Sequence, residues 1–181
     1  MVAAEDKILL WVAASGDPDS GAPAWLPERM GAAESTRLVD AALREGVAGL
    51  LYRRLKTCGR LQALDGPARG RLESIYYLTI QTNLRFFAAL KEIAEEGVPF
   101  VLMQGAALLA DTYPDPGLRP LSDIDLWVLP RNRERLMAVL SRLGFEENPL
   151  VPGVLRRSAV LVDVHMHLDW AQRIQARRFL F

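Results

Sequence analysis

The segment Leu121-Ser-Asp-Ile-Asp-Leu-Trp-Val128 alternates polar and apolar residues, as a half-buried β-strand does. Side chains two apart on a strand point to the same face, so Asp123, Asp125 and Trp127 share one side and the intervening apolar residues fill the other. Two carboxylates about 6 to 7 Å apart on one face repel each other unless a cation or solvent compensates. The segment therefore predicts a strand with a core face and a site face, and magnesium, which prefers oxygen ligands, is the expected ion.

A second apolar run, Val160 to Leu168, shows the same alternation and carries a second set of polar side chains. Asp163, His165, His167 and Asp169 share one face of this predicted strand. If the two strands are neighbours, about 4.8 Å apart, Asp163 joins the first two aspartates, and three carboxylates can hold one or two metal ions. Such a site is suited to phosphoryl transfer, with the third carboxylate free to deprotonate the attacking hydroxyl.

The acidic pair alone does not identify such a site. With 22 acidic residues in 181 positions, about two or three pairs at this spacing arise by chance. Asp17 and Asp19, which flank a proline, form another pair. Solvated acids at strand ends therefore explain the spacing equally well. The two histidines offer a third interpretation, a zinc or other transition-metal site shared with Asp163 and Asp169.

The remainder of the chain predicts a mixed architecture of the α/β (α+β) type. Apolar residues recur at helical spacing before Pro99, and short apolar runs separated by turn residues follow it. We expect a helical subdomain over residues 1–97 and an α/β domain over residues 98–181. The expected helices are Asp6–Ala14, Ser35–Lys56, Ala68–Glu96, Ala106–Thr112 and Arg131–Leu143, and the expected strands are Phe100–Met103, Ile124–Leu129 and Val160–Leu168.

Composition limits the classes of partner and the compartment. The 22 basic and 22 acidic residues cancel, so no overall field draws the protein onto DNA or an anionic membrane, and neither is an expected partner. The single cysteine, Cys58, cannot form an intramolecular disulfide and is expected at a helix end rather than as a nucleophile. No secretion signal or membrane-spanning run is evident, so we expect a cytoplasmic protein.

Three segments together resemble a known family. Phe100–Leu109, Tyr113–Val128 and Val162-Asp-Val-His165 are similar to the uncharacterised nucleotidyltransferase family of the polymerase-beta-like superfamily, and the resemblance extends over most of the chain from about Ser35 onward. It implies a nucleotidyltransferase palm with a small mixed sheet, preceded by the helical subdomain. Family members generally continue well beyond this length, so the palm is expected to be truncated at its C-terminal side, which leaves a fragment or a short form as alternatives.

The resemblance also implies the roles of the acidic residues. Asp123 and Asp125 match the metal-binding pair, and Asp163 matches the third acid of the catalytic site. The implied cofactor is Mg²⁺, with Mn²⁺ as an alternative. His165 matches a family histidine and is expected beyond the direct metal ligands, where it orients Asp163 or contacts substrate.

A second set of residues is implied to bind the nucleotide. Gly105 matches the glycine of a strand-to-helix turn that lets the backbone approach the triphosphate. Arg119 and Ser122 flank the acidic motif, where they can contact phosphate or brace the aspartates. Gln104 departs from the family, which commonly has lysine there, and glutamine donates a hydrogen bond to phosphate without neutralising it. The alternative to an active enzyme is therefore a catalytically impaired nucleotide-binding or regulatory module.

The implied reaction transfers a nucleoside monophosphate from a nucleoside triphosphate, such as ATP, to an acceptor, with release of pyrophosphate. The acceptor, whether protein, RNA or small molecule, stays open, as do the preferred base and the oligomeric state. Trp127 and Trp170 can stack on a base, although a tryptophan at a strand end more often packs on a neighbouring helix.

Overall fold

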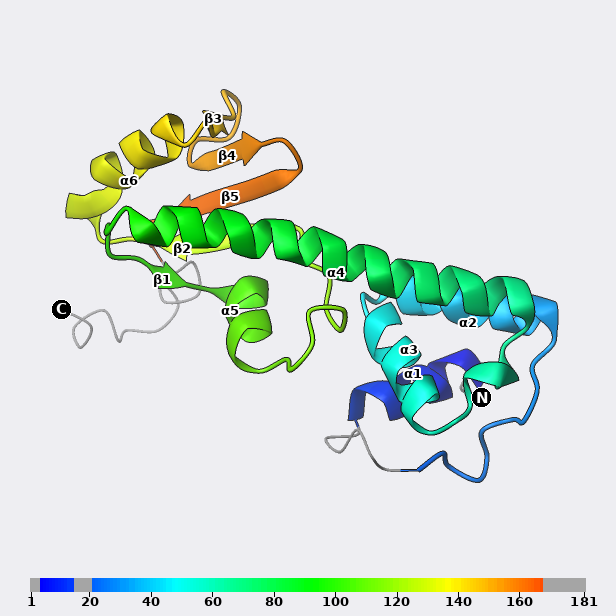
Figure 1. Cartoon of the computed structure of the whole chain (residues 1–181). Coiled ribbons are helices and arrows are strands. Elements are labelled where there is room, and N and C mark those ends of the chain that lie inside the picture. The colour runs from blue at the N-terminus through cyan, green and yellow to red at the C-terminus, as the bar shows by residue number, and fades with distance from the viewer. Residues whose placement is uncertain (1–3, 15–20, 168–181) are drawn as a thin grey trace. The chain divides into compact units, whose positions relative to one another are not determined.

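The computed structural model describes residues 4–14 and 21–167 (Figure 1). Over these residues six α-helices, one 3-10 helix and a five-stranded mixed sheet confirm the predicted α+β class. The helices are α1 (Ala4–Ala14), α2 (Ala32–Arg44), α3 (Ala48–Thr57), η1 (Leu61–Ala63), α4 (Gly66–Glu95), α5 (Gln104–Asp111) and α6 (Pro130–Arg142). The strands are β1 (Val101–Leu102), β2 (Ile124–Trp127), β3 (Glu146–Glu147), β4 (Val154–Arg157) and β5 (Val160–His165). No helix among the described residues is both long and apolar enough to cross a membrane.

The prediction of one helix over Ser35–Lys56 is wrong, because the chain forms α2 and α3 with a break between them. Gly46 adopts a φ of 69°, its N–H donates to the carbonyl of Leu43, and the N–H of Val47 donates to the carbonyl of Ala42. This pair of bonds around a left-handed glycine is a Schellman helix end. The apolar stripe continues across the break, so periodicity alone concealed it. Cys58 lies directly after α3, at the predicted helix end.

The other four predicted α-helices are confirmed to within two residues at each end. The three predicted strands are present as the shorter β1, β2 and β5, whereas β3 and β4 were not predicted. β3 consists of two exposed glutamates, and β4 ends in two arginines. Neither has the apolar alternation of a half-buried strand, so their strand character depends on pairing with the next strand along the chain, β3 with β4 and β4 with β5.

Contacts divide the chain into two units, each described by itself. The first comprises Met1–Asn83 with Tyr113–Pro120, and the second comprises Leu84–Thr112 with Leu121–Phe181. The apolar faces of α1 to α3 and the first turns of α4 form the core of the first unit. Its residues with no exposed surface are Leu38, Val39, Ala42, Leu51, Leu55 and Leu72.

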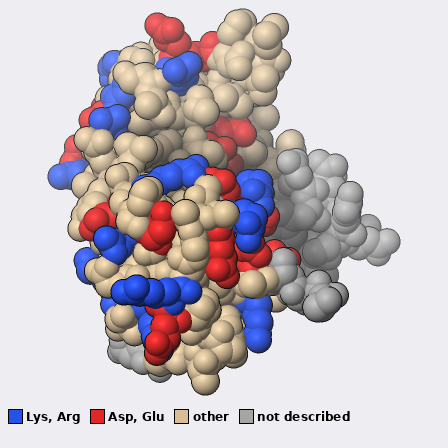
Figure 2. All heavy atoms as spheres, turned by 90° about the vertical axis from the view of Figure 1, so that its right-hand side faces the viewer, with Lys and Arg blue, Asp and Glu red and all other residues tan. Residues whose placement is uncertain are grey.

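Charges of both signs are interspersed on one face of the molecule (Figure 2). Figure 2 shows basic and acidic side chains side by side on the face that it presents. In the first unit, Arg37 pairs with Glu5 at 2.6 Å and Arg71 pairs with Asp40 at 2.6 Å. This interspersion of opposite charges is consistent with the zero formal net charge.

Within the first unit, the segment Tyr113–Pro120 is held on α3 and α4 through Asp115. The Asp115 carboxylate accepts hydrogen bonds from the Arg53 guanidinium at 2.7 Å, the Tyr76 hydroxyl, and the Gly117 N–H at 2.8 Å. Burial raises the pKa of Asp115, but these hydrogen bonds outweigh it and leave the pKa below its usual value. Burial, with the bond to Asp115, raises the pKa of Tyr76 to about 12. Asp115 is therefore an ionised anchor for the segment at neutral pH.

Asn83 in α4 provides a second anchor for this segment. Its side chain is fully buried, and its amide donates to the carbonyls of Pro116 at 2.6 Å and Arg119 at 2.7 Å. We expect Asn83→Ala to lower the free energy of unfolding by about 2 to 3 kcal/mol, because two carbonyls lose their buried donor. Urea denaturation measures this effect, with Gln81→Ala, an exposed position of the same helix, as the control. Equal stability of the two variants would contradict this anchoring role.

In the second unit, the sheet has the strand order β1-β2-β5-β4-β3. β2 and β5 are parallel neighbours, and the other three pairings are antiparallel. The apolar residues of β2 and β5 share a core with α6 and with the last turns of α4. Core residues of these two helices are Phe86, Ala89, Ile93, Leu136, Val139 and Leu140. With one face of the sheet occupied by this core, the polar side chains of β2 and β5 lie on the other.

Candidate metal and nucleotide site

The register between β2 and β5 determines which polar side chains meet. Asp125 lies opposite Asp163, and Trp127 lies opposite His165. Ile124, which is 1% exposed, begins β2, and along β5 the buried valines alternate with half-buried residues that include Asp163 and His165. The predicted adjacency of the two strands is confirmed, and it juxtaposes one aspartate from each.

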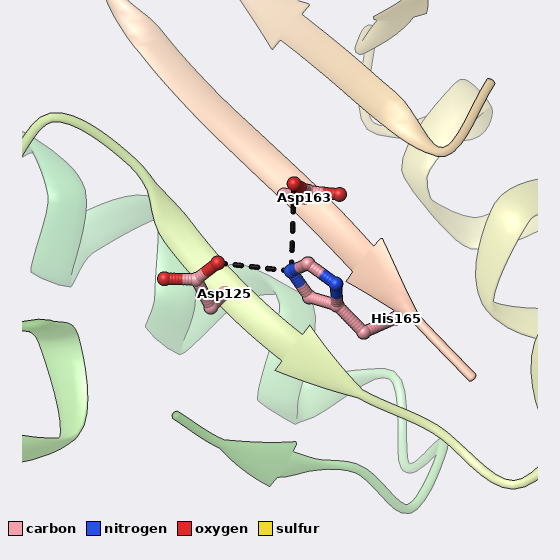
Figure 3. A group of neighbouring side chains, drawn as sticks. All are labelled: Asp125, Asp163 and His165. Atoms are coloured by element: carbon pink, nitrogen blue, oxygen red, sulfur yellow. Dashed lines mark hydrogen bonds and ion pairs between the residues drawn. The ribbon is translucent and has the colours of Figure 1, made fainter. Parts of the chain in front are cut away.

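Asp125, Asp163 and His165 form a compact group of side chains (Figure 3). The Nε2 atom of His165 lies 2.9 Å from Oδ1 of Asp125 and 3.4 Å from Oδ2 of Asp163. One potential ligand atom from each residue lies within 4.8 Å of the other two. Asp125 is 6% exposed, whereas Asp163 and His165 are half-buried and open to solvent. The group offers two carboxylate oxygens and one imidazole nitrogen at a partly accessible point of the sheet.

Asp123 lies just before β2 and is not a member of this group. Its Oδ1 accepts a hydrogen bond from the hydroxyl of Ser122 at 2.8 Å. Asp123 has no partner in the register between β2 and β5, so its position depends on the chain that leads into the strand. The structure thus brings Asp125 together with Asp163 and places Asp123 two residues upstream, bonded to Ser122.

His167 is exposed and lies beyond the end of β5, outside the group of potential ligands. The histidine that joins the carboxylates is His165, and its partner from the neighbouring strand is Asp125. Asp169 and Trp170 lie outside the described residues. The contact between His165 and Asp125 was not anticipated from the sequence, because it depends on the register of two strands 40 residues apart.

The turn from β1 into α5 lies directly beside β2. The N–H of Met103 donates to the carbonyl of Asp125 at 2.9 Å, and Met103 precedes α5 without a side-chain capping bond. Gln104, which is exposed, adopts a φ of 51° and begins the helix, followed by Gly105. The left-handed residue of this turn is therefore the glutamine and not the glycine. The first N–H groups of a helix and its positive dipole end favour an anion such as phosphate.

Arg119 lies in the first unit, in the segment Tyr113–Pro120. Its carbonyl accepts the hydrogen bond from Asn83, and its side-chain Nε atom is buried without a hydrogen-bond partner among the described residues. A buried N–H without an acceptor costs about 1 to 3 kcal/mol. An anionic ligand that supplies an acceptor would remove this cost.

The donor set suits a divalent cation. The buried carboxylate of Asp125 lies close to a second carboxylate, and two such charges require a compensating positive charge. The Nε2 atom of His165 contacts both of them. A divalent ion with oxygen and nitrogen ligands would satisfy the same group.

A small mixed sheet, an Asp-x-Asp strand, a parallel neighbour that carries a third acid, and a strand-to-helix turn beside them define a nucleotidyltransferase-like fold. The chain belongs to the uncharacterised nucleotidyltransferase family, whose model matches residues 31–180. This match confirms the resemblance found in the sequence. No curated protein and no solved structure matched the chain in the corresponding searches.

Proposed function

We propose that this chain is a metal-dependent nucleotidyltransferase that moves a nucleoside monophosphate from a nucleoside triphosphate to an acceptor hydroxyl. The observation that carries the proposal is the juxtaposition of Asp125 and Asp163 across β2 and β5 in a member of a nucleotidyltransferase family. Two carboxylates from adjacent strands, one of them buried, are suited to binding a divalent ion beside a phosphate.

Asp123, Asp125 and Asp163 would hold the ion, for which Mg²⁺ is the reference choice and Mn²⁺ the alternative. Bound there, the ion would neutralise phosphate charge and polarise the reacting phosphoryl group. Asp125 is fixed by the sheet and is the most buried of the three acids. Asp163, which is half-buried, can accept the proton of the attacking hydroxyl. His165 lies next to both carboxylates, with Nε2 at 2.9 Å from Asp125 and 3.4 Å from Asp163.

Four residues would meet the phosphates. The α5 N-terminus at Gln104 and Gly105 supplies backbone N–H groups, and the exposed Gln104 amide can donate a further bond. Ser122 offers its hydroxyl next to Asp123. The family resemblance adds Arg119, whose Nε atom has no hydrogen-bond partner among the described residues and is a donor that a phosphate oxygen can satisfy.

The reaction balances without any further reagent. The acceptor oxygen forms a bond to the α-phosphorus, and the bond from that phosphorus to the bridging oxygen of the β-phosphate breaks. Pyrophosphate leaves with the bond electrons, and the hydroxyl proton passes to Asp163. The side chains align the reactants and stabilise charge, which is how most phosphoryl-transfer enzymes act.

A catalytically impaired nucleotide-binding or regulatory module is the second candidate. The observation that favours it is Gln104, a neutral side chain at the start of α5, where the family resemblance leads us to expect lysine. Without that charge, the site can bind a triphosphate yet stabilise less of the charge that develops on the leaving group. Measuring binding and turnover on the same protein separates the two candidates.

The test combines titration calorimetry with a pyrophosphate-release assay. ATP, GTP, CTP and UTP are supplied with Mg²⁺ or Mn²⁺ and with protein, RNA and small-molecule acceptors. We expect turnover that falls by about 10³-fold or more in the Asp123→Asn, Asp125→Asn double variant, because its metal ligands are lost. Undiminished turnover in the double variant would refute the proposal. Nucleotide binding without pyrophosphate release under every condition would favour the module.

A further inference from the structure

The side chain of His165 points between two carboxylates from two different strands (Figure 3). A single atom, Nε2, contacts Asp125 at 2.9 Å and Asp163 at 3.4 Å. A histidine that only orients Asp163 needs to contact that one carboxylate. The additional contact with the buried Asp125 places the nitrogen where both carboxylates converge.

These distances match the spacing between adjacent ligands of one metal ion. Ligands about 2.1 Å from an ion are about 3.0 Å apart in an octahedral arrangement, and about 3.4 Å apart in a tetrahedral one. The two measured distances between nitrogen and oxygen fall in this range. The Nε2 atom and either carboxylate oxygen can therefore be neighbouring ligands of one ion, and ligand atoms of all three residues lie within 4.8 Å of one another.

The backbone at this point is held on both strands. The N–H of Val128 donates to the carbonyl of His165 at 2.9 Å, and Trp127 lies opposite His165 in the parallel register. Asp125 and Asp163 are likewise partners in that register. A donor set on paired strands is rigid, and rigid donor sets discriminate between ions by size and ligand type.

We infer that His165 is a direct metal ligand through Nε2, and that the site binds a divalent transition-metal ion of the series from Mn²⁺ to Zn²⁺ in preference to Mg²⁺. This inference rests on the metal requirement of the proposed function and deepens it by naming the class of ion. Imidazole nitrogen favours first-row transition ions, whereas Mg²⁺ prefers oxygen ligands and water. The ligating tautomer carries its proton on Nδ1, and phosphate oxygens complete the coordination.

Pulsed electron paramagnetic resonance of bound Mn²⁺ tests the ligand directly. The full chain, free of any affinity tag, contains two histidines, His165 and His167, so each can be removed in turn. We expect a ¹⁴N coupling of a ligated imidazole in the wild type, its loss in His165→Asn, and its retention in His167→Asn. The second variant is a matched control, because His167 is exposed and lies outside the group.

Ion selectivity provides an independent measurement. Calorimetric titration of the same three proteins with Zn²⁺, Mn²⁺ and Mg²⁺ is expected to show at least about tenfold weaker Zn²⁺ and Mn²⁺ binding in His165→Asn. Mg²⁺ binding in that variant is expected to change less than about threefold, because Mg²⁺ relies on the carboxylates. Both measurements report on the ion alone and need neither nucleotide nor acceptor.

The inference would be wrong if Mn²⁺ bound to the wild type showed no ¹⁴N coupling, or if Mn²⁺ did not bind. It would also be wrong if His165→Asn weakened the binding of Zn²⁺, Mn²⁺ and Mg²⁺ equally. The pyrophosphate assay keeps this failure distinct from failure of the proposed function. If the bound ion shows ¹⁴N coupling but the protein never releases pyrophosphate, His165 is a metal ligand and the proposed enzymatic function is wrong. If the protein turns over with an ion that shows no ¹⁴N coupling, the proposed function holds and His165 is not a ligand.

Discussion

Replacing Asp125 by asparagine is expected to lower kcat/KM for pyrophosphate release by about 10³-fold or more. Asp125 is the most buried acid of the proposed site and lies opposite Asp163 in the sheet. Loss of its charge removes an anionic metal ligand from a position that solvent cannot easily compensate. A loss of about 4 kcal/mol in transition-state stabilisation corresponds to this change in rate. The measurement is a continuous pyrophosphate assay at saturating Mn²⁺ or Mg²⁺.

The fold is expected to survive this substitution. Asparagine has the shape of aspartate, and its carbonyl oxygen can still accept a hydrogen bond from His165. We therefore expect the metal-free stability of Asp125→Asn to stay within about 1 kcal/mol of the wild type.

Asp111→Asn is a suitable control, because Asp111 is exposed at the end of α5 in the same unit. It should leave kcat/KM within about twofold of the wild type, since exposed substitutions away from a site have small effects. If Asp125→Asn and Asp111→Asn retained equal activity, Asp125 would not be a ligand of the essential metal.

The two central strands of the sheet could be predicted from sequence because their pattern is local. Apolar residues alternate with Asp125 on one strand and with Asp163 and His165 on the other, and a period of two admits only one face for each set. Helices α4 and α6 were predictable for a similar reason, since their periodicity and the glycines that end them, Gly97 and Gly144, lie within or just after each segment.

The contacts of the site could not be predicted in the same way. The sequence puts His165 on the same face as Asp163 but does not determine the register against β2. That register brings Asp125 to 2.9 Å from the His165 nitrogen, and a slip of one residue would turn Asp125 away from it. Gln104 illustrates a different limit. Glycine adopts a positive φ more readily than glutamine, so the sequence would place a positive φ at Gly105, yet the structure has it at Gln104.

The hydrogen bonds that join distant segments could not be predicted from the sequence either. Asn83 interrupts the apolar pattern of α4 as an ordinary polar residue would, yet its amide is bonded to two carbonyls more than 30 residues away. Asp115 resembles any aspartate in a turn until Arg53 and Tyr76 are placed beside it. Tertiary hydrogen bonds leave no periodic signal, so only the fold reveals them.

Among the substitutions considered, replacing Gly49 in α3 is expected to lower the free energy of unfolding most. A Cβ atom at this position would lie 1.9 Å from the carbonyl oxygen of Gly117 and 2.9 Å from the Cα atom of Leu118. Both are backbone atoms of the segment Tyr113–Pro120, so no side-chain rotation can relieve the overlap. The segment cannot retreat without loss of its bonds to Asn83 and to the residues around Asp115.

We expect Gly49→Ala to lower the free energy of unfolding by about 3 kcal/mol or more, despite the higher helix propensity of alanine. Urea denaturation followed by circular dichroism measures the change. Gly70→Ala is the matched control, because Gly70 also lies within a helix but has no atom within 4 Å of the added Cβ. That variant should gain up to about 1 kcal/mol. Equal unfolding midpoints for the two variants would show that α3 does not pack closely against Tyr113–Pro120.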